Sequence, residues 1–149
     1  MSTTDPLSWA YHADFAELIV KKDPKVALRL LEVADIALAF ARALVAKEYH
    51  RANAMISSAA KPSYPPQVLQ KNLEEMVQYS GDESVWPTGL QVVTGADISD
   101  MDKWLRKTPQ DFGWAYVSVD GDGYCEAVTV MVSDDGGKLA IREIEWGRP

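Results

Sequence analysis

The chain has 149 residues, of which 47% are hydrophobic and 25% are charged, and its formal net charge at neutral pH is −7. This length is typical of one domain, and the hydrophobic content is too high for a disordered chain. The negative charge argues against nucleic acid and against an anionic membrane as binding partners. We therefore expect a single globular domain over residues 1–149.

The charge is unevenly distributed along the chain, and the single cysteine bears on the compartment in which the protein is expected. Residues 1–62 contain 8 Lys and Arg against 7 Asp and Glu, whereas residues 63–149 contain 7 against 15, so the second part carries −8. Cys125 has no second cysteine to pair with, which favours a reducing compartment and a small buried apolar role for the thiol. The first residues lack a basic start followed by an apolar run, so the expected location is cytoplasmic.

Two aspartate–proline pairs mark helix starts in the first part of the chain. Aspartate is a preferred N-cap and proline fits the first helical position, so these pairs predict helices over residues 6–22 and 24–46. Apolar residues in the second helix recur at alternating spacings of four and three: Val26, Leu30, Val33, Ala37, Phe40 and Leu44. A second apolar stripe beside them indicates that this helix is covered on more than one side and lies centrally.

Two further helices precede a change to strand periodicity. A short helix is expected over residues 48–58, and another begins at Pro65 and Pro66 and ends at Gly81. The remaining elements are a strand over 90–94, a short helix over 97–107 and strands over 113–119, 124–133 and 138–146. Glycine-rich turns at 120–123 and 134–137 join the last three strands into an antiparallel meander. Helices followed by hairpins predict the α+β class.

This order of elements resembles the nuclear transport factor 2-like superfamily, also called the cystatin-like cone. The resemblance covers most of residues 26–146, and its most recognisable segment is AFARALVAKEYHRANAMISSAAKPSYPPQVLQKNLEEMV. It implies N-terminal helices packed on a strongly curved antiparallel sheet that encloses a pocket. The helix predicted over residues 6–22 and the helical segment near Met101 to Arg106 depart from the pattern of the superfamily. Members of the superfamily use the pocket for isomerase or dehydratase chemistry or for binding alone, some act as immunity proteins against bacterial toxins, and homodimers are common.

A set of polar and aromatic residues on the predicted strands is the candidate ligand-binding site. Strict alternation places Arg142 on one face of the last strand together with Ala140, Ile144 and Trp146. If Arg142 points into the cone, it needs a partner such as Glu126, because an unpaired buried charge is costly. The alternative is a cross-strand ion pair on a solvated face. The candidate residues are Trp114, Tyr116, Glu126, Arg142 and Trp146.

The sequence carries no recognised motif for a catalytic residue, a metal or a nucleotide cofactor, so none is assigned. A second candidate surface is acidic: Asp97, Asp100 and Asp102, with Asp134 and Asp135 further along, either form solvated turns or steer a basic protein partner. We therefore expect a non-catalytic binding or protein-interaction domain, in the manner of an immunity-type inhibitor. The alternative is a cone pocket for a small polar molecule, with isomerase or dehydratase activity.

Overall fold

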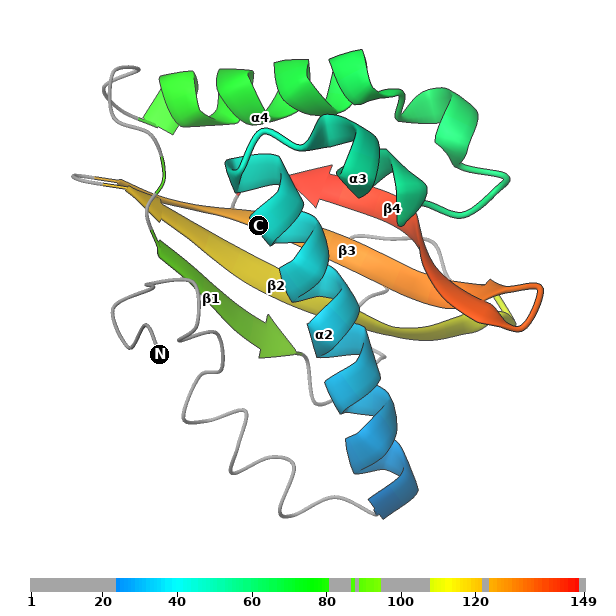
Figure 1. Cartoon of the computed structure of the whole chain (residues 1–149). Coiled ribbons are helices and arrows are strands. Elements are labelled where there is room, and N and C mark those ends of the chain that lie inside the picture. Colours follow the sequence, from blue (N-terminus) through cyan, green and yellow to red (C-terminus); the bar gives the residue numbers. More distant parts are fainter. Residues whose placement is uncertain (1–23, 81–86, 88, 95–107, 122–123, 148–149) are drawn as a thin grey trace, which may run out of the picture.

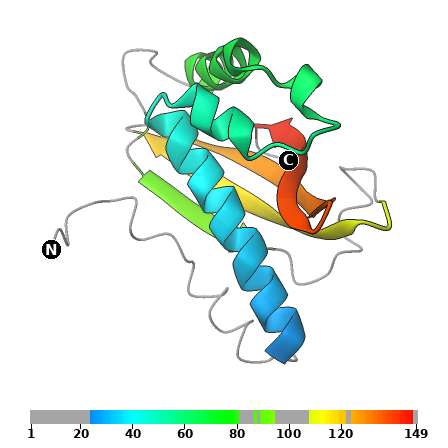
Figure 2. The same cartoon turned by 45° about the vertical axis from the view of Figure 1, so that its right-hand side comes forward.

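The computed structural model describes residues 24–80, 87, 89–94, 108–121 and 124–147. These residues form two layers, with three α-helices on one face of a four-stranded antiparallel sheet (Figure 1). A second view shows the same arrangement, with the first turns of the longest helix projecting past the sheet (Figure 2). The predicted α+β class is confirmed. The helices predicted over 6–22 and 97–107 lie outside the described residues.

The helical layer consists of α2 (Pro24–Val45), α3 (Tyr49–Ala54), the short 3₁₀ helix η2 (Lys61–Ser63) and α4 (Pro66–Ser80). Helix α2 begins at the proline that follows Asp23, as predicted, and it crosses the sheet diagonally (Figure 1). It ends where Lys47 takes a left-handed backbone conformation with φ of 62°, and the Glu48 N–H donates to the Ala43 carbonyl at 2.8 Å. This is the hydrogen bond of a Schellman cap, built here on a lysine instead of the usual glycine.

The strands are β1 (Gly89–Thr94), β2 (Asp111–Gly121), β3 (Tyr124–Asp135) and β4 (Lys138–Trp146). They pair in chain order, each antiparallel to the next. The turn between β3 and β4 contains Gly136 and Gly137 at φ of 68° and 93°, a conformation that favours glycine. The predicted meander and the predicted short strand before it are both present.

The prediction of a strongly curved, cone-like sheet is wrong, because the sheet is not strongly curled. Bulges are the usual means of bending a sheet, and the two register shifts lie together at one end, between Asp111 and Gly113 of β2 and between Met131 and Val132 of β3. From Gly113 to Gly121 the pairing of β2 with β3 is regular. The sheet therefore has no series of bends along its length that would close it into a cone.

Apolar side chains fill the space between the sheet and the helices. Phe40 and Leu44 of α2, together with Leu73 of α4, are at most 1% exposed. The sheet contributes a layer of small and β-branched residues to the same cluster: Ala115, Val117, Val119, Val128, Val130, Val132, Ile141 and Ile144. The volume that a cone pocket would occupy is thus taken up by the core in the described part of the chain.

Tyr49, at the start of α3, is a buried side chain whose hydroxyl has no hydrogen-bond partner among the described residues. Burial raises the pKa of this phenol above its ordinary value of 10.0, and the negative charge of Glu74 adds to the effect. The folded state therefore keeps the proton at a pH at which the unfolded chain loses it. Consequently the stabilising effect is complete below pH 10 and is lost as the pH rises through the raised pKa.

Replacing Tyr49 with phenylalanine is expected to reduce this alkaline loss and to leave stability at pH 7 equal or about 1 kcal/mol higher, since an orphan hydroxyl disappears. Urea denaturation at pH 7 and above pH 10 measures both effects. Tyr64→Phe is the contrasting variant, because the Tyr64 hydroxyl accepts a hydrogen bond from the Ile144 N–H at 3.4 Å. That variant should lose stability at pH 7. Equal alkaline losses in Tyr49→Phe and the unmodified protein would contradict the prediction.

Candidate binding groove

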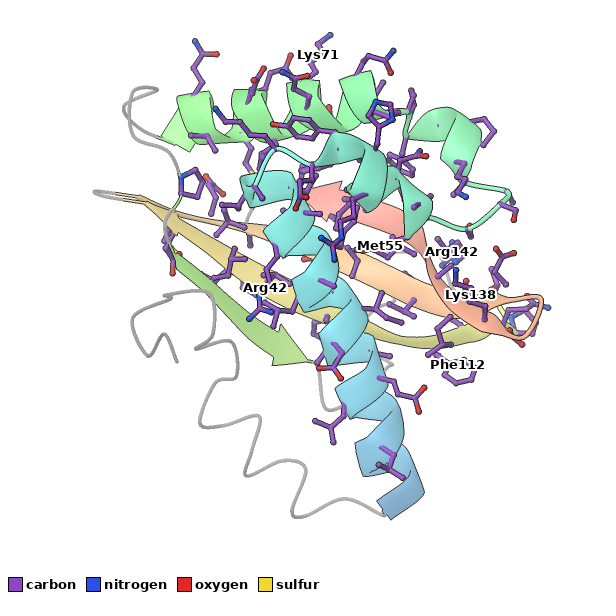
Figure 3. The ribbon with its side chains drawn as sticks, in the orientation of Figure 1. Arg42, Met55, Lys71, Phe112, Lys138 and Arg142 are labelled. Atoms are coloured by element: carbon purple, nitrogen blue, oxygen red, sulfur yellow. The ribbon has the colours of Figure 1, made fainter. Side chains whose placement is uncertain are left out.

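An open groove of about 420 Å³ lies on the surface between α2, α3 and the beginning of β4. Its apolar lining comes from Ile36 and Ala39 of α2, Ala54 at the end of α3, Met55 directly after it, and Leu139 of β4. Met55 and Lys138 mark two of its walls in Figure 3. Ile36 and Ala39 are three residues apart in α2, which places both side chains on one side of that helix. The groove therefore has walls from three separate parts of the chain.

The wall formed by α3 is fixed to β4 by backbone hydrogen bonds. The Ile141 N–H donates to the Met55 carbonyl at 2.8 Å, and the Ser57 N–H donates to the Ile141 carbonyl at 2.8 Å. These two bonds make a short parallel bridge between Ile56 and Ile141. The bridge satisfies the outer edge of β4 at this point, and it holds Met55 beside Leu139.

A side-chain clamp holds the hairpin that leads into β4. Asp135 accepts hydrogen bonds from the Ser58 N–H at 3.0 Å and from the Ser58 hydroxyl at 3.1 Å. Asp134 accepts a bond from the Gly137 N–H at 2.7 Å, which stabilises the turn itself. Both aspartates thus accept hydrogen bonds at this turn. The clamp also positions Lys138, the first residue of β4, at the rim of the groove.

Three charged side chains, Asp35, Arg51 and Lys138, complete the lining, and all three residues are exposed. Arg51 pairs with Glu48 at 3.7 Å, and both side chains are more than half exposed. Such a pair contributes little to stability and leaves the guanidinium accessible. The groove therefore combines an apolar floor with a charged, water-facing rim.

The ligand-binding residues predicted from the sequence do not gather in this groove. Ala115 and Val117 of β2 pack into the helix-facing core, so the alternating residues Trp114 and Tyr116 lie on the opposite face of the sheet. Trp114 packs there against Met131 in a separate small cluster. These two aromatic residues are thus separated by the sheet from the helical layer that was expected to form a pocket with them.

The alternation assumed for β4 is wrong because a bulge interrupts it at Arg142. Met131 pairs with Glu143 while Val132 pairs with Ile141, so Arg142 is the extra residue. As a result Ile141 and Ile144, which strict alternation puts on opposite faces, both belong to the helix-facing core. Leu139 and Trp146 pack against that core as well.

Arg142 forms a bidentate ion pair with Asp111. Its Nε lies 2.8 Å from Oδ1 of Asp111, and its Nη2 lies 3.0 Å from Oδ2. Asp111 also accepts bonds from the Thr108 N–H at 2.7 Å and from the Thr108 hydroxyl at 3.0 Å. The Asp111 side chain is 2% exposed and the Arg142 side chain is 19% exposed, so the pair is largely buried and is not a solvated cross-strand contact. Arg142 also lies 3.8 Å from the partly exposed carboxylate of Glu143.

Glu126 lies far from Arg142 in the sheet. It pairs with Val119 at the opposite end of β3 from Val132, a separation of six residues or roughly 20 Å along the strand. Trp146 pairs with Val128, near Glu126, and packs against the helix-facing core. The structure therefore divides the predicted set into Trp114 and Tyr116 on one face, Glu126 and Trp146 on the other, and Arg142 in its pair with Asp111.

Two further predictions concern cysteine and acidic residues. Cys125, the second residue of β3, is exposed and not buried as expected. Its sulfur lies 3.3 Å from the Ser118 hydroxyl.

The three acidic residues proposed for partner binding, Asp97, Asp100 and Asp102, lie outside the described residues, so the basic protein partner remains a prediction.

Within the described ranges, no group of three or more His, Cys, Asp and Glu side chains is arranged to hold a metal ion. The helices described in the same ranges are too short or too polar to cross a membrane.

Comparison of the chain with protein-family models, with curated proteins and with solved structures finds no match in any of the three.

Proposed function

We propose that the protein is a non-catalytic binding domain and that the groove between α2, α3 and β4 is its binding site. The observation that carries this proposal is the contrast between the interior of the fold, which is filled, and the surface groove, which is open. Side chains at most 1% exposed, such as Phe40 and Leu44, fill the interior between sheet and helices, whereas about 420 Å³ of apolar groove is open at the surface. Ligand sites are commonly clefts of about 300–1,000 Å³ with a mostly apolar lining and a few polar groups.

The placement of the charged groups supports binding over catalysis. Asp35, Arg51 and Lys138 come from three different elements and lie at an exposed rim. Acid–base and electrostatic catalysis rely on groups that are held in fixed positions and shielded from water. Long exposed side chains at a rim are better suited to recognising the charge of a bound group than to moving a proton within it.

We also propose that the domain is related to the nuclear transport factor 2-like superfamily. The support is the order of elements: a long central helix, a short helix, a proline-containing connection, a third helix, and then an antiparallel meander. This relationship is a proposal about ancestry. The binding proposal does not depend on it, since fold does not decide function.

The proposal predicts that filling the groove abolishes binding of an apolar probe. N-phenyl-1-naphthylamine, a neutral dye whose fluorescence rises in apolar surroundings, serves as the probe. Ala39 is exposed and lines the groove, so Ala39→Trp introduces a large side chain without disturbing the core. We expect at least about a tenfold loss of affinity, because the indole replaces the probe on the apolar floor.

The matched control is Gln67→Trp, which places the same indole at an exposed position near the start of α4. It should leave the affinity for the dye unchanged. Thermal denaturation of both variants checks that the fold is intact. Equal affinities for the dye in Ala39→Trp and in the unmodified protein would refute the groove as the binding site.

A further inference from the structure

We infer that the groove binds a small amphipathic anion, with the apolar body on Ile36, Met55 and Leu139 and the negative head group at Lys138 and Arg51. This inference rests on the proposed function and adds the chemical class of the ligand. Both cationic residues line the same groove as the apolar floor. A single molecule that spans floor and rim therefore meets an apolar surface and positive charge together.

Lys138 supplies the more available of the two charges. It is exposed, and its ammonium makes no hydrogen bond or ion pair with any other residue that the structure describes. Its neighbour Leu139 contributes to the apolar floor, so the charge lies beside apolar surface. The clamp between Asp135 and Ser58 fixes the hairpin that carries Lys138, which reduces the entropy lost when a ligand is bound.

Arg51 provides the second positive charge, from the wall formed by α3. It precedes Ala54 and Met55 by three and four residues on α3, so the guanidinium lies one turn away from their apolar side chains. Its contact with Glu48 is a long, exposed pair, which a ligand carboxylate displaces at little cost. Two different elements, α3 and β4, thus each bring one positive charge to the groove lining.

The acidic residues near these cations are Asp35 in the groove lining, Glu48 at 3.7 Å from Arg51, and Asp135, which pairs with Lys138 between β3 and β4. Asp35, the acidic residue of the lining, takes part in an interaction of its own. The net charge of −7 is spread over the whole chain, and charges more than about 8–10 Å apart are largely screened at physiological ionic strength. Within the groove lining Lys138 and Arg51 outnumber Asp35, whereas Glu48 and Asp135 lie outside the lining and Asp135 is held by its hydrogen bonds to Ser58.

The test uses three compounds with the same ten-carbon chain: decanoate, decan-1-ol and decyltrimethylammonium, each below the concentration at which it forms micelles. Each competes with N-phenyl-1-naphthylamine for the full-length protein. The charge-reversal variant Lys138→Glu is compared with Lys71→Glu. Lys71 is exposed on α4 and points away from the sheet, so it is a matched control outside the groove (Figure 3).

We expect Lys138→Glu to lower the affinity for decanoate about fivefold, as the loss of one exposed charge pair implies. The affinity for decyltrimethylammonium should rise, and the affinity for decan-1-ol should not change. Lys71→Glu should alter none of the three. Arg51→Gln, which keeps a polar side chain of similar length, should weaken decanoate in the same direction.

Decanoate affinity that is unaffected by both groove variants would overturn the anion assignment. An equal change for all three compounds would do the same, because the effect would then not depend on charge. Failure of decan-1-ol and decanoate alike to displace the dye from the unmodified protein would instead overturn the proposed function. The two proposals therefore fail by different results.

Discussion

Replacing Asp111 with alanine should destabilise the fold by about 3 kcal/mol, because it removes the bidentate carboxylate partner of the largely buried Arg142 guanidinium and leaves only the 3.8 Å contact with Glu143. Asp111 is 2% exposed, and it receives two hydrogen bonds from Arg142 and two from Thr108. Few single changes in the described part of the chain remove as many charge-assisted contacts. A loss of this size is a large part of the total stability of a typical domain, which is about 5–15 kcal/mol.

Urea denaturation of Asp111→Ala, Arg142→Met and the double variant measures the coupling between the two side chains. We expect the double variant to be more stable than the sum of the single losses predicts, because it removes both charges from the buried site. Glu48→Gln is the control, since its pair with Arg51 is exposed and should contribute less than about 1 kcal/mol. A loss below 1 kcal/mol in Asp111→Ala would contradict the buried pair.

Truncating Phe40 to alanine should cost about 3–5 kcal/mol, because it removes a large side chain from a tightly packed interior. Phe40 lies on the face of α2 that packs against the core and is 1% exposed. This prediction tests the conclusion that the interior is a core and not a pocket. A pocket wall would tolerate the change far better, since a side chain that faces a cavity buries less apolar surface.

Leu28→Ala on the same helix is the matched control for Phe40→Ala. Leu28 is 62% exposed, so its truncation should change the free energy of unfolding by less than about 0.5 kcal/mol. Chemical denaturation of the two variants under identical conditions gives the comparison. Similar losses in both would show that the face assigned to the core is wrong.

Much of the described fold is predictable because its signals are local. The proline after Asp23 marks the start of α2, the periodic apolar residues identify its buried face, and the glycines at 136 and 137 locate the last turn. The range predicted for the last strand, 138–146, matches β4. Each of these features depends on residues that are close together in the chain.

The errors arise where the geometry is not local. The bulge at Arg142 reverses the alternation of β4, and no residue type in that strand marks it as the extra residue. The partner of Arg142 is Asp111, 31 residues away, and it becomes a neighbour only through the pairing of β2, β3 and β4. Strict alternation in β4 therefore predicts the wrong neighbours for Arg142, among them Glu126.

The groove also has no signature in the sequence. Its walls come from the middle of α2, the end of α3 and the first residues of β4, and they meet because the Ile56–Ile141 bridge and the Ser58–Asp135 clamp bring them together. Alanine is a common residue in helices, so Ala39 and Ala54 do not signal a groove in the sequence. Only the packing of the three elements shows that these small side chains leave space.

The most direct test of the groove is a titration of ¹⁵N-labelled protein with N-phenyl-1-naphthylamine, followed by backbone amide chemical shifts. We predict that the largest changes occur at the residues that line the groove, with Ile36, Met55 and Leu139 among them. Changes centred instead on Trp114 and Tyr116, on the opposite face of the sheet, would contradict the assignment and return the binding site to the residues singled out from the sequence.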